Sequence, residues 1–159
     1  MSGMDGATEG LLDGLQQLQS KLGGGLGAPM GRTLGFDLVE VERGRAVFAG
    51  RPERKVYNPL GAVHGGYAAT LLDSAGGIAT HSTLGPGRSH TTLELKVSYL
   101  RPLNEDSGEV RASGRVISVG KRVAFAEATL HDEAGQLCAT ATSTLLVFDL
   151  KPRPGAGFS

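Results

Sequence analysis

The segment NPLGAVHGGYAATLLDS, residues 58–74, passes from a loop into a helix. Pro59 and Gly61 disfavour regular structure, whereas residues 65 to about 80 place apolar side chains on one face at helical spacing. That face consists of Ala68, Leu71, Leu72, Ala75, Ile78 and Ala79. Because most of these side chains are small, the predicted helix can lie close against a sheet.

Strands are predicted on both sides of this helix. Their ranges are 35–42, 45–51, 90–101, 109–118, 122–131 and 137–148. In the range 90–101, Leu93, Leu95, Val97 and Tyr99 alternate with polar residues, which predicts a strand with two unlike faces. One helix inserted among the strands of a single antiparallel sheet predicts an α+β fold in which the helix covers one face.

The two ends of the chain are expected to lie outside this sheet. Leucines at positions 11, 12, 15, 18 and 22 recur at spacings of three and four, which predicts an extra N-terminal helix over 8–22 that glycines 23–25 would end. The residues 151–159 contain two prolines and predict a flexible tail. We therefore divide the chain into an N-terminal helix and linker (1–30), a main domain (31–150) and the tail.

The charges of the chain balance, with 16 Lys and Arg against 16 Asp and Glu in 159 residues. A global field that would attract nucleic acid or an anionic membrane is missing, and neither partner is expected. The single cysteine, Cys138, excludes an intrachain disulfide framework and favours the reducing cytoplasm. The sequence also lacks a secretory signal and an apolar run of about 20 residues that could span a bilayer.

Metal-binding and serine-hydrolase motifs are not found in the sequence. His64, His81, His90 and His131 are isolated, without HExxH or CxxC spacing, so no metal site is expected. We expect the last three of these histidines at the surface or at strand ends. The GxSxG elbow of a serine hydrolase is absent.

The start of the central helix and its one carboxylate are the candidate catalytic groups. The first-turn N–H groups at Gly65 and Gly66 have no partner within the helix, so they can stabilise the oxyanion that forms when a thioester carbonyl is attacked. Asp73 is either the acid that acts on the same carbonyl or a solvated residue of the polar face. Gly65 and Asp73 are separated by about 12 Å of helix, which is too far for one carbonyl. If the two cooperate, Asp73 must come from a neighbouring chain whose helix runs antiparallel.

Over residues 34–147 the sequence resembles the hotdog fold, in the PaaI-like branch of the hydroxybenzoyl-CoA thioesterase superfamily. The matching features are Asn58, Gly61, the triplet His64-Gly65-Gly66, Asp73 nine positions after the histidine, the strand TTLELKVSYLRP, the VGKR turn and the closing GQLCATATSTLLV. The resemblance implies a six-stranded antiparallel sheet wrapped around the central helix. It also implies an essential homodimer with sites at the interface, and relatives are commonly tetramers.

The resemblance also implies roles for individual residues. The Gly65 amide would polarise the thioester carbonyl, and Asp73 of the other subunit would act as nucleophile or general base. Asn58 and His64 would position the thioester or the attacking water, and Thr92 would supply a polar contact near the acid. For His64 the alternative is a helix cap, and for Asn58 it is a turn residue.

Contacts to coenzyme A are implied at the end of one strand and in one turn. The residues available there are Tyr99, Arg101, Lys121 and Arg122, with Arg88 as a weaker candidate. Each basic residue taken singly can also be an ordinary exposed charge. The acyl group could be lined by Tyr67, Leu71, Tyr99 and Phe125, for which core packing is the alternative.

The expected function is hydrolysis of an aryl-, phenylacetyl- or medium-chain acyl-CoA to the free acid and CoA. No cofactor is expected, since coenzyme A is part of the substrate. A hotdog protein that binds acyl-CoA without hydrolysing it is the alternative, but a binding module would not need a carboxylate beside the oxyanion donors. Hydration of an enoyl thioester ranks last, because hydratases of this fold use a different arrangement of Asp and His.

Overall fold

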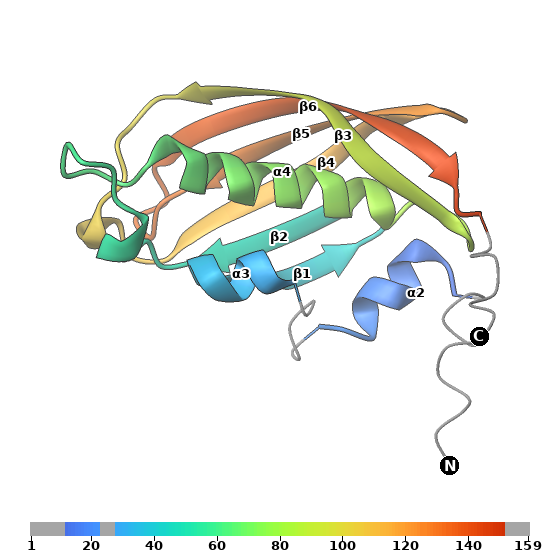
Figure 1. The fold of residues 1–159 in the computed structure, drawn as a ribbon, viewed down its shortest axis with the longest axis horizontal. Helices are drawn as coiled ribbons and strands as arrows, with labels where there is room; N and C mark the ends of the chain where they lie inside the picture. Colours follow the sequence, from blue (N-terminus) through green and yellow to red (C-terminus); the bar gives the residue numbers. More distant parts are fainter. Residues whose placement is uncertain (1–11, 23–27, 152–159) are drawn as a thin grey trace, which may run out of the picture.

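The computed structural model describes residues 12–22 and 28–151, in which one curved antiparallel sheet wraps around a long helix (Figure 1). The strands are β1 (Phe36–Glu42), β2 (Arg45–Gly50), β3 (Arg88–Tyr99), β4 (Val110–Val119), β5 (Val123–His131) and β6 (Leu137–Asp149). The helices are α2 (Gly14–Gln19), α3 (Pro29–Leu34) and α4 (Gly65–His81), and η1 (Arg54–Val56) and η2 (Glu105–Ser107) are short 3₁₀ turns. The strand order β1-β2-β4-β5-β6-β3 leaves β1 and β3 at the edges. The predicted α+β hotdog architecture is therefore confirmed.

Helix α4 lies unusually close to the sheet because small residues meet at the contact. A Cβ atom added to Gly114 of β4 would lie only 2.2 Å from the carbonyl oxygen of Ala75. On the same side of the helix, a Cβ at Gly76 would lie 3.3 Å from Oγ of Ser143. Leu71 and Ala75 of the helix are completely buried. The backbone of α4 therefore packs directly against the strands, as its small apolar face predicts.

Strand β3 contains a bulge that interrupts the predicted alternation. Thr92 pairs with Leu145 and Glu94 pairs with Thr144, so Leu93 is the extra residue. The side chain of Leu93 is 60% exposed, and the prediction that it shares a face with Leu95 is wrong. The physical reason is that a bulge moves the residues before it and after it out of phase with each other.

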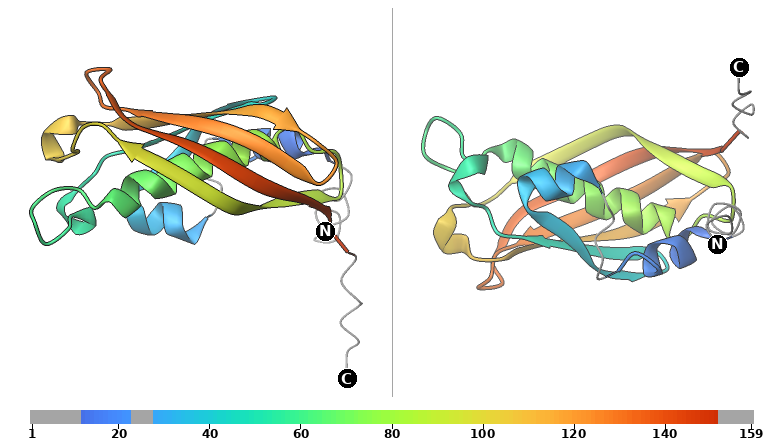
Figure 2. Two further views of the ribbon diagram at one scale, coloured as in Figure 1. Left: turned by 90° about the horizontal axis from the view of Figure 1, so that it is seen from above. Right: turned by 60° about the horizontal axis from the view of Figure 1, so that its bottom comes forward.

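The N-terminal helices lie on the same side of the sheet as α4 (Figure 2). The described part of the predicted helix 8–22 is helical only over Gly14–Gln19, because the Asp13 side chain and Gln16 form a capping box that starts the helix there. Leu18 is buried in the main core. Residues 8–11 and 23–25 lie outside the described residues, as does all of the predicted tail except residue 151.

Helix α3 was not predicted and crosses the proposed boundary between linker and main domain. It begins at Pro29, which tolerates the first helical position, and ends where Gly35 adopts a left-handed φ of 76°. The division of the chain into 1–30, 31–150 and 151–159 stays a prediction. None of the helices described within 12–22 and 28–151 combines the length and the hydropathy needed to cross a membrane.

The contact between Gly114 and α4 provides a test of the fold. We expect Gly114→Ala to lower the free energy of unfolding by about 3 kcal/mol or more, because its methyl group would overlap the backbone of α4. Gly85→Ala is the matched control, since a Cβ there has no neighbour within 4 Å. Urea denaturation of both variants at one protein concentration measures the difference, and equal stability would contradict the close contact.

Candidate active site

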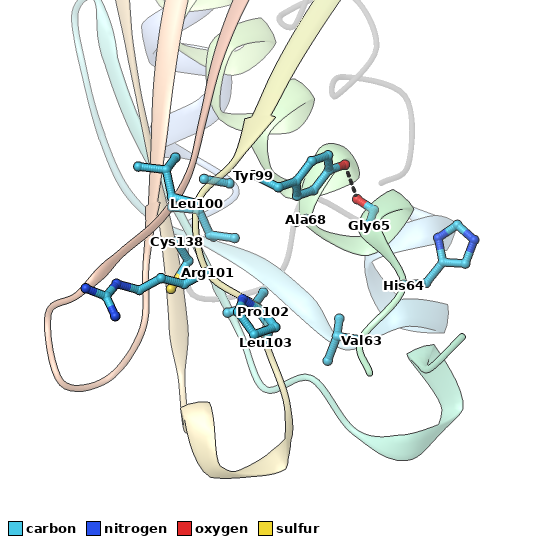
Figure 3. Close-up of a pocket in the computed structure, with 12 residues that line it drawn as sticks. Val63, His64, Gly65, Ala68, Tyr99, Leu100, Arg101, Pro102, Leu103 and Cys138 are labelled. Carbon is cyan, nitrogen blue, oxygen red and sulfur yellow. Dashed lines mark hydrogen bonds between the residues drawn. The ribbon is translucent and has the colours of Figure 1, made fainter. Parts of the chain in front are cut away.

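A cavity of about 290 Å³ opens at the N-terminal end of α4, and we refer to it as the Gly65 cavity (Figure 3). It is lined by Val63, His64, Gly65, Ala68, Tyr99, Leu100, Arg101, Pro102, Leu103, Leu130, Cys138 and Ala139. The walls are mostly apolar. The polar groups that could orient a ligand are concentrated where α4 begins and β3 ends.

The first turn of α4 leaves one backbone donor available. Nδ1 of His64 accepts a hydrogen bond from the Gly66 N–H at 2.8 Å, and the Tyr67 N–H donates to the His64 carbonyl. Within the described part of the chain, the Gly65 N–H has no acceptor. This donor lies at the positive end of the helix dipole, which is the arrangement that stabilises an oxyanion. His64 thus caps the helix, and any catalytic role for it stays a prediction.

Tyr99, the last residue of β3, lines the Gly65 cavity and contacts the first residue of α4. Its hydroxyl donates to the Gly65 carbonyl oxygen at 2.6 Å, as the dashed line in Figure 3 marks. Burial raises the pKa of Tyr99, so the phenol stays protonated and remains a donor at neutral pH. This bond ties the peptide units at the start of α4 to the end of β3.

Asn58 shapes the loop before α4, whereas Arg101 forms part of the wall of the Gly65 cavity. Oδ1 of Asn58 accepts from the N–H groups of Leu60 and Ala62 at 2.9 and 3.2 Å, so the side chain acts as a turn residue. Arg101 belongs to the cavity wall, but its side chain extends outward, away from Gly65 (Figure 3). This placement is compatible with an anionic group at the mouth of the cavity.

A second cavity of about 230 Å³ lies farther along α4, and we refer to it as the Asp73 cavity. Its lining comprises Ala28, Met30, Gly31, Phe36, Phe48, Asp73, Ser74, Gly77, Ile78, His90 and Thr92. The Thr92 hydroxyl donates to Oδ1 of Asp73 at 2.9 Å, which fixes the half-buried carboxylate. Phe36 and Phe48 meet edge to face, with 6.0 Å between ring centroids, and provide an aromatic wall.

The two cavities are separate in a single chain. Gly65 borders one and Asp73 borders the other, with about 12 Å of helix between them. Lys121 and Arg122 are also far from Arg101, because their turn lies near the start of β3. The Arg88 guanidinium donates to the Lys121 carbonyl oxygen at 2.7 Å and also binds Asp149. One chain therefore gathers the predicted residues into two groups, one at each end of β3.

His90 is a site residue that the sequence analysis missed. It lies two residues from the start of β3, near the strand end where it was expected, and it also lines the Asp73 cavity, which was not expected. Burial lowers the pKa of His90 to about 4, and neighbouring His81 contributes in the same direction, while the charge of Asp73 acts in the opposite direction. The available signal was its position two residues before Thr92, which puts both side chains on one face of β3.

Three of the four residues expected to line the acyl group, Tyr67, Leu71 and Phe125, line neither cavity. Tyr67 and Leu71 are buried in the core, which was the alternative for both. Phe125 is 47% exposed and lies between inward-facing Ala124 and Ala126, so it points to the outer face of the sheet. Phe125 therefore lines neither cavity, and that expectation is wrong.

The sequence matches known thioester-cleaving enzymes. Residues 60–139 match the family model described as Thioesterase superfamily. A 1,4-dihydroxy-2-naphthoyl-CoA hydrolase of Listeria monocytogenes is 30% identical over 115 residues, which cover 72% of this chain and 92% of that protein.

Solved structures share the same architecture. A thioesterase of Haemophilus influenzae matches with a TM-score of 0.75 at 22% identity, covering 88% of this chain and 94% of that chain, and this likeness concerns the fold alone. A variant of the phenylacetic acid degradation protein PaaI from Thermus thermophilus matches with a TM-score of 0.67 at 29% identity, covering 75% and 98%. The sequence matches the family model and the Listeria relative, and the sheet wrapped around α4 matches the solved structures. This chain therefore belongs to the thioesterase superfamily and is a hotdog-fold, PaaI-like thioester hydrolase.

Proposed function

We propose that the protein hydrolyses acyl-CoA thioesters at composite sites, each built from the Gly65 cavity of one subunit and the Asp73 cavity of its partner. The observation that carries this proposal is the separation of Gly65 and Asp73 along one rigid helix. A coenzyme A thioester is favoured because the Listeria relative is a CoA-ester hydrolase. The acyl group would be aryl, phenylacetyl or medium-chain, as the apolar and aromatic walls of the Asp73 cavity favour.

The edge strand β3 supports a homodimer of this kind. It is 12 residues long, has no neighbour on its outer side within the described sheet, and exposes 60% of Leu93 and 55% of Tyr99. Such edges readily pair with another chain. Antiparallel pairing of two β3 strands would run the two α4 helices in opposite directions, bringing each Gly65 towards the Asp73 of the partner subunit. A tetramer built from such dimers stays a prediction.

The same pairing would unite the groups that could bind coenzyme A. Tyr99 and Arg101 lie at one end of β3, and Lys121 and Arg122 lie near its other end. In an antiparallel pair, the end of one β3 strand lies beside the start of the other. The mouth of each composite site would therefore receive cationic side chains from both subunits. These side chains would bind the phosphates of the CoA nucleotide by charge-assisted hydrogen bonds.

The chemistry follows from where charge develops. The Gly65 N–H donates to the carbonyl oxygen and stabilises its negative charge as the carbonyl carbon is attacked. In a general-base route, Asp73 takes a proton from water and hydroxide adds to the carbonyl carbon. The C–S bond then breaks to release the acid and the CoA thiolate, which takes up the proton from Asp73. In a nucleophilic route, a carboxylate oxygen of Asp73 displaces CoA, and water then hydrolyses the mixed anhydride.

Neighbouring residues would hold these groups in place. The Thr92 hydroxyl already donates to one oxygen of Asp73, which leaves the other carboxylate oxygen for water or the carbonyl carbon. His64 and Asn58 would position the first turn of α4 and the loop before it, through the hydrogen bonds that they form there. The proposal requires no cofactor beyond the CoA group of the substrate.

Replacing Asp73 by Asn tests the role of the carboxylate. We expect turnover of benzoyl-, phenylacetyl- and hexanoyl-CoA to fall by about 10²- to 10⁴-fold, because Asn is nearly isosteric but cannot accept a proton or attack a carbonyl. Thiol release from each ester measures the rate, and Asp106→Asn, an exposed position in η2, is the matched control. Wild-type rates in Asp73→Asn would remove the residue from the mechanism. Binding of all esters by the wild-type protein without turnover would favour a non-catalytic acyl-CoA-binding protein.

Mixed dimers test the composite site. Gly65→Pro removes the N–H, and proline is tolerated here because it is the first helical position and His64 before it is extended, with φ −59° and ψ 133°. We expect each homodimer of Gly65→Pro or Asp73→Asn to be inactive and a mixture to recover part of the activity, since one of the two sites would be intact.

Gly65→Ala is the control for this experiment, because it adds a Cβ near the Tyr99 hydroxyl but keeps the N–H. It should retain most of its activity. Absence of recovery in the mixture, after native mass spectrometry has verified subunit exchange, would contradict a site shared between subunits.

A further inference from the structure

The first turn of α4 begins with two glycines, Gly65 and Gly66, whose backbone torsions no side chain restricts. Glycine allows a substrate oxygen to come close to the Gly65 N–H. An N–H group whose direction varies is a poor oxyanion donor, however, because catalysis depends on donors that are already aimed at the developing charge. The first turn therefore needs restraints that the two glycines do not provide themselves.

Both peptide units that meet at Gly65 are restrained by hydrogen bonds. The unit between His64 and Gly65 carries the donor N–H, and its carbonyl oxygen accepts from the Tyr67 N–H at 2.9 Å. The unit between Gly65 and Gly66 is held at both ends. Its N–H donates to Nδ1 of His64 at 2.8 Å, and its oxygen accepts from the Tyr99 hydroxyl at 2.6 Å.

Tyr99 differs from the other two partners because it reaches the turn from another element. The bonds of Tyr67 and His64 lie within the turn, so they move with it. Tyr99 is the last residue of β3, and Figure 3 shows its hydroxyl directed at the Gly65 carbonyl oxygen. Strand β3 is held by β6 up to this residue, where Tyr99 pairs with Ala139. The hydroxyl thus anchors the start of α4 to the sheet.

The phenol and the glycine are in close contact. A Cβ atom at Gly65 would lie 3.1 Å from the Tyr99 hydroxyl oxygen and 3.2 Å from the ring carbon that carries it. The hydroxyl has a single proton, which it donates to Gly65. Tyr99 would therefore contact coenzyme A through its ring, which leaves the phosphates to the cationic side chains.

Packing does not account for this orientation of Tyr99. The residue is 55% exposed, so it buries little apolar surface in the core. Burial of the phenol nevertheless raises the pKa of Tyr99, so the hydroxyl keeps its proton and remains a donor at neutral pH. The position of the ring is explained better by the one polar contact that its hydroxyl forms.

We infer that Tyr99 is a positioning residue for thioester hydrolysis, whose hydroxyl holds the Gly65–Gly66 peptide unit so that the Gly65 N–H points at the oxyanion. This inference rests on the proposed use of that N–H in acyl-CoA hydrolysis. Tyr99 does not touch the reacting atoms and acts through the backbone of Gly65. Its bond also polarises the peptide unit that donates to His64, since hydrogen bonds in a chain strengthen one another.

Tyr99→Phe tests this role by removing only the hydroxyl. We expect kcat for benzoyl- and phenylacetyl-CoA to fall about 10-fold, because a poorly aimed N–H stabilises the oxyanion less. KM should change by less than about 2-fold, since the oxyanion exists in the transition state and not in the bound ester. Tyr57→Phe is the matched control, because its hydroxyl also bonds to the backbone, at the Glu105 N–H, and both constants should stay unchanged.

The carbonyl stretch of a bound ester separates positioning from a loss of stability. Benzoyl-CoA labelled with ¹³C at the carbonyl is bound to Asp73→Asn, in which turnover is slow, and its infrared spectrum is compared with that of the unlabelled ester. Polarisation by the Gly65 N–H should lower the frequency below that of the free ester, and adding Tyr99→Phe should reverse part of this shift. Replacing Tyr99 by 4-aminophenylalanine restores a donor at the same place and should recover the shift and, with Asp73 intact, kcat.

The outcomes distinguish this inference from the proposed function. If wild type hydrolyses the esters and Tyr99→Phe keeps the same kcat, or changes only KM, the positioning role is overturned and the proposed function stands. If wild type binds the esters without hydrolysing them, the proposed function fails, and the carbonyl stretch in the wild-type protein still tests Tyr99. A frequency that Tyr99→Phe leaves unchanged, or the failure of every ester to bind, would then overturn the inference as well.

Discussion

The direct contact between the backbone of α4 and the sheet is the constraint on which the rest of the structure depends. Gly114 meets the carbonyl oxygen of Ala75 without an intervening side chain, so the helix is held deep in the curve of the sheet. Its position is therefore determined by backbone packing, which tolerates little adjustment. Gly65 and Asp73 inherit this rigidity, because both belong to the same helix. The small residues between α4 and the sheet thus determine the positions of Gly65 and Asp73.

A rigid helix also explains why the Gly65 cavity and the Asp73 cavity stay apart in one chain. Convergence of Gly65 and Asp73 on one carbonyl would require α4 to bend sharply, which the surrounding strands prevent. The helix instead presents the proposed oxyanion donor at its end and a carboxylate two turns farther along. Under the proposed pairing, a second copy supplies the missing half, and assembly becomes a condition for catalysis.

Periodicity in the sequence predicted the six strands and α4 because each has one face against the core. It could not predict the bulge, since Leu93 is as apolar as Leu95 and continues the alternation without a break. The contribution of His90 to the Asp73 cavity was missed for a related reason, because an isolated histidine carries no pattern of its own. Helix α3 is too short for a helical repeat to emerge. The resemblance to hotdog thioesterases identified Asp73 and Thr92, whose contact the structure contains.

The bulge in β3 connects these observations. Thr92 holds Asp73 and Tyr99 holds the first residue of α4, so both side chains must face the helix. They are seven positions apart, and in a regular strand an odd separation would place them on opposite faces. The extra residue at Leu93 shifts the phase once and allows both contacts. One strand therefore positions the polar groups of both cavities. Because that strand is also the exposed edge of the sheet, pairing there would stabilise both half-sites together.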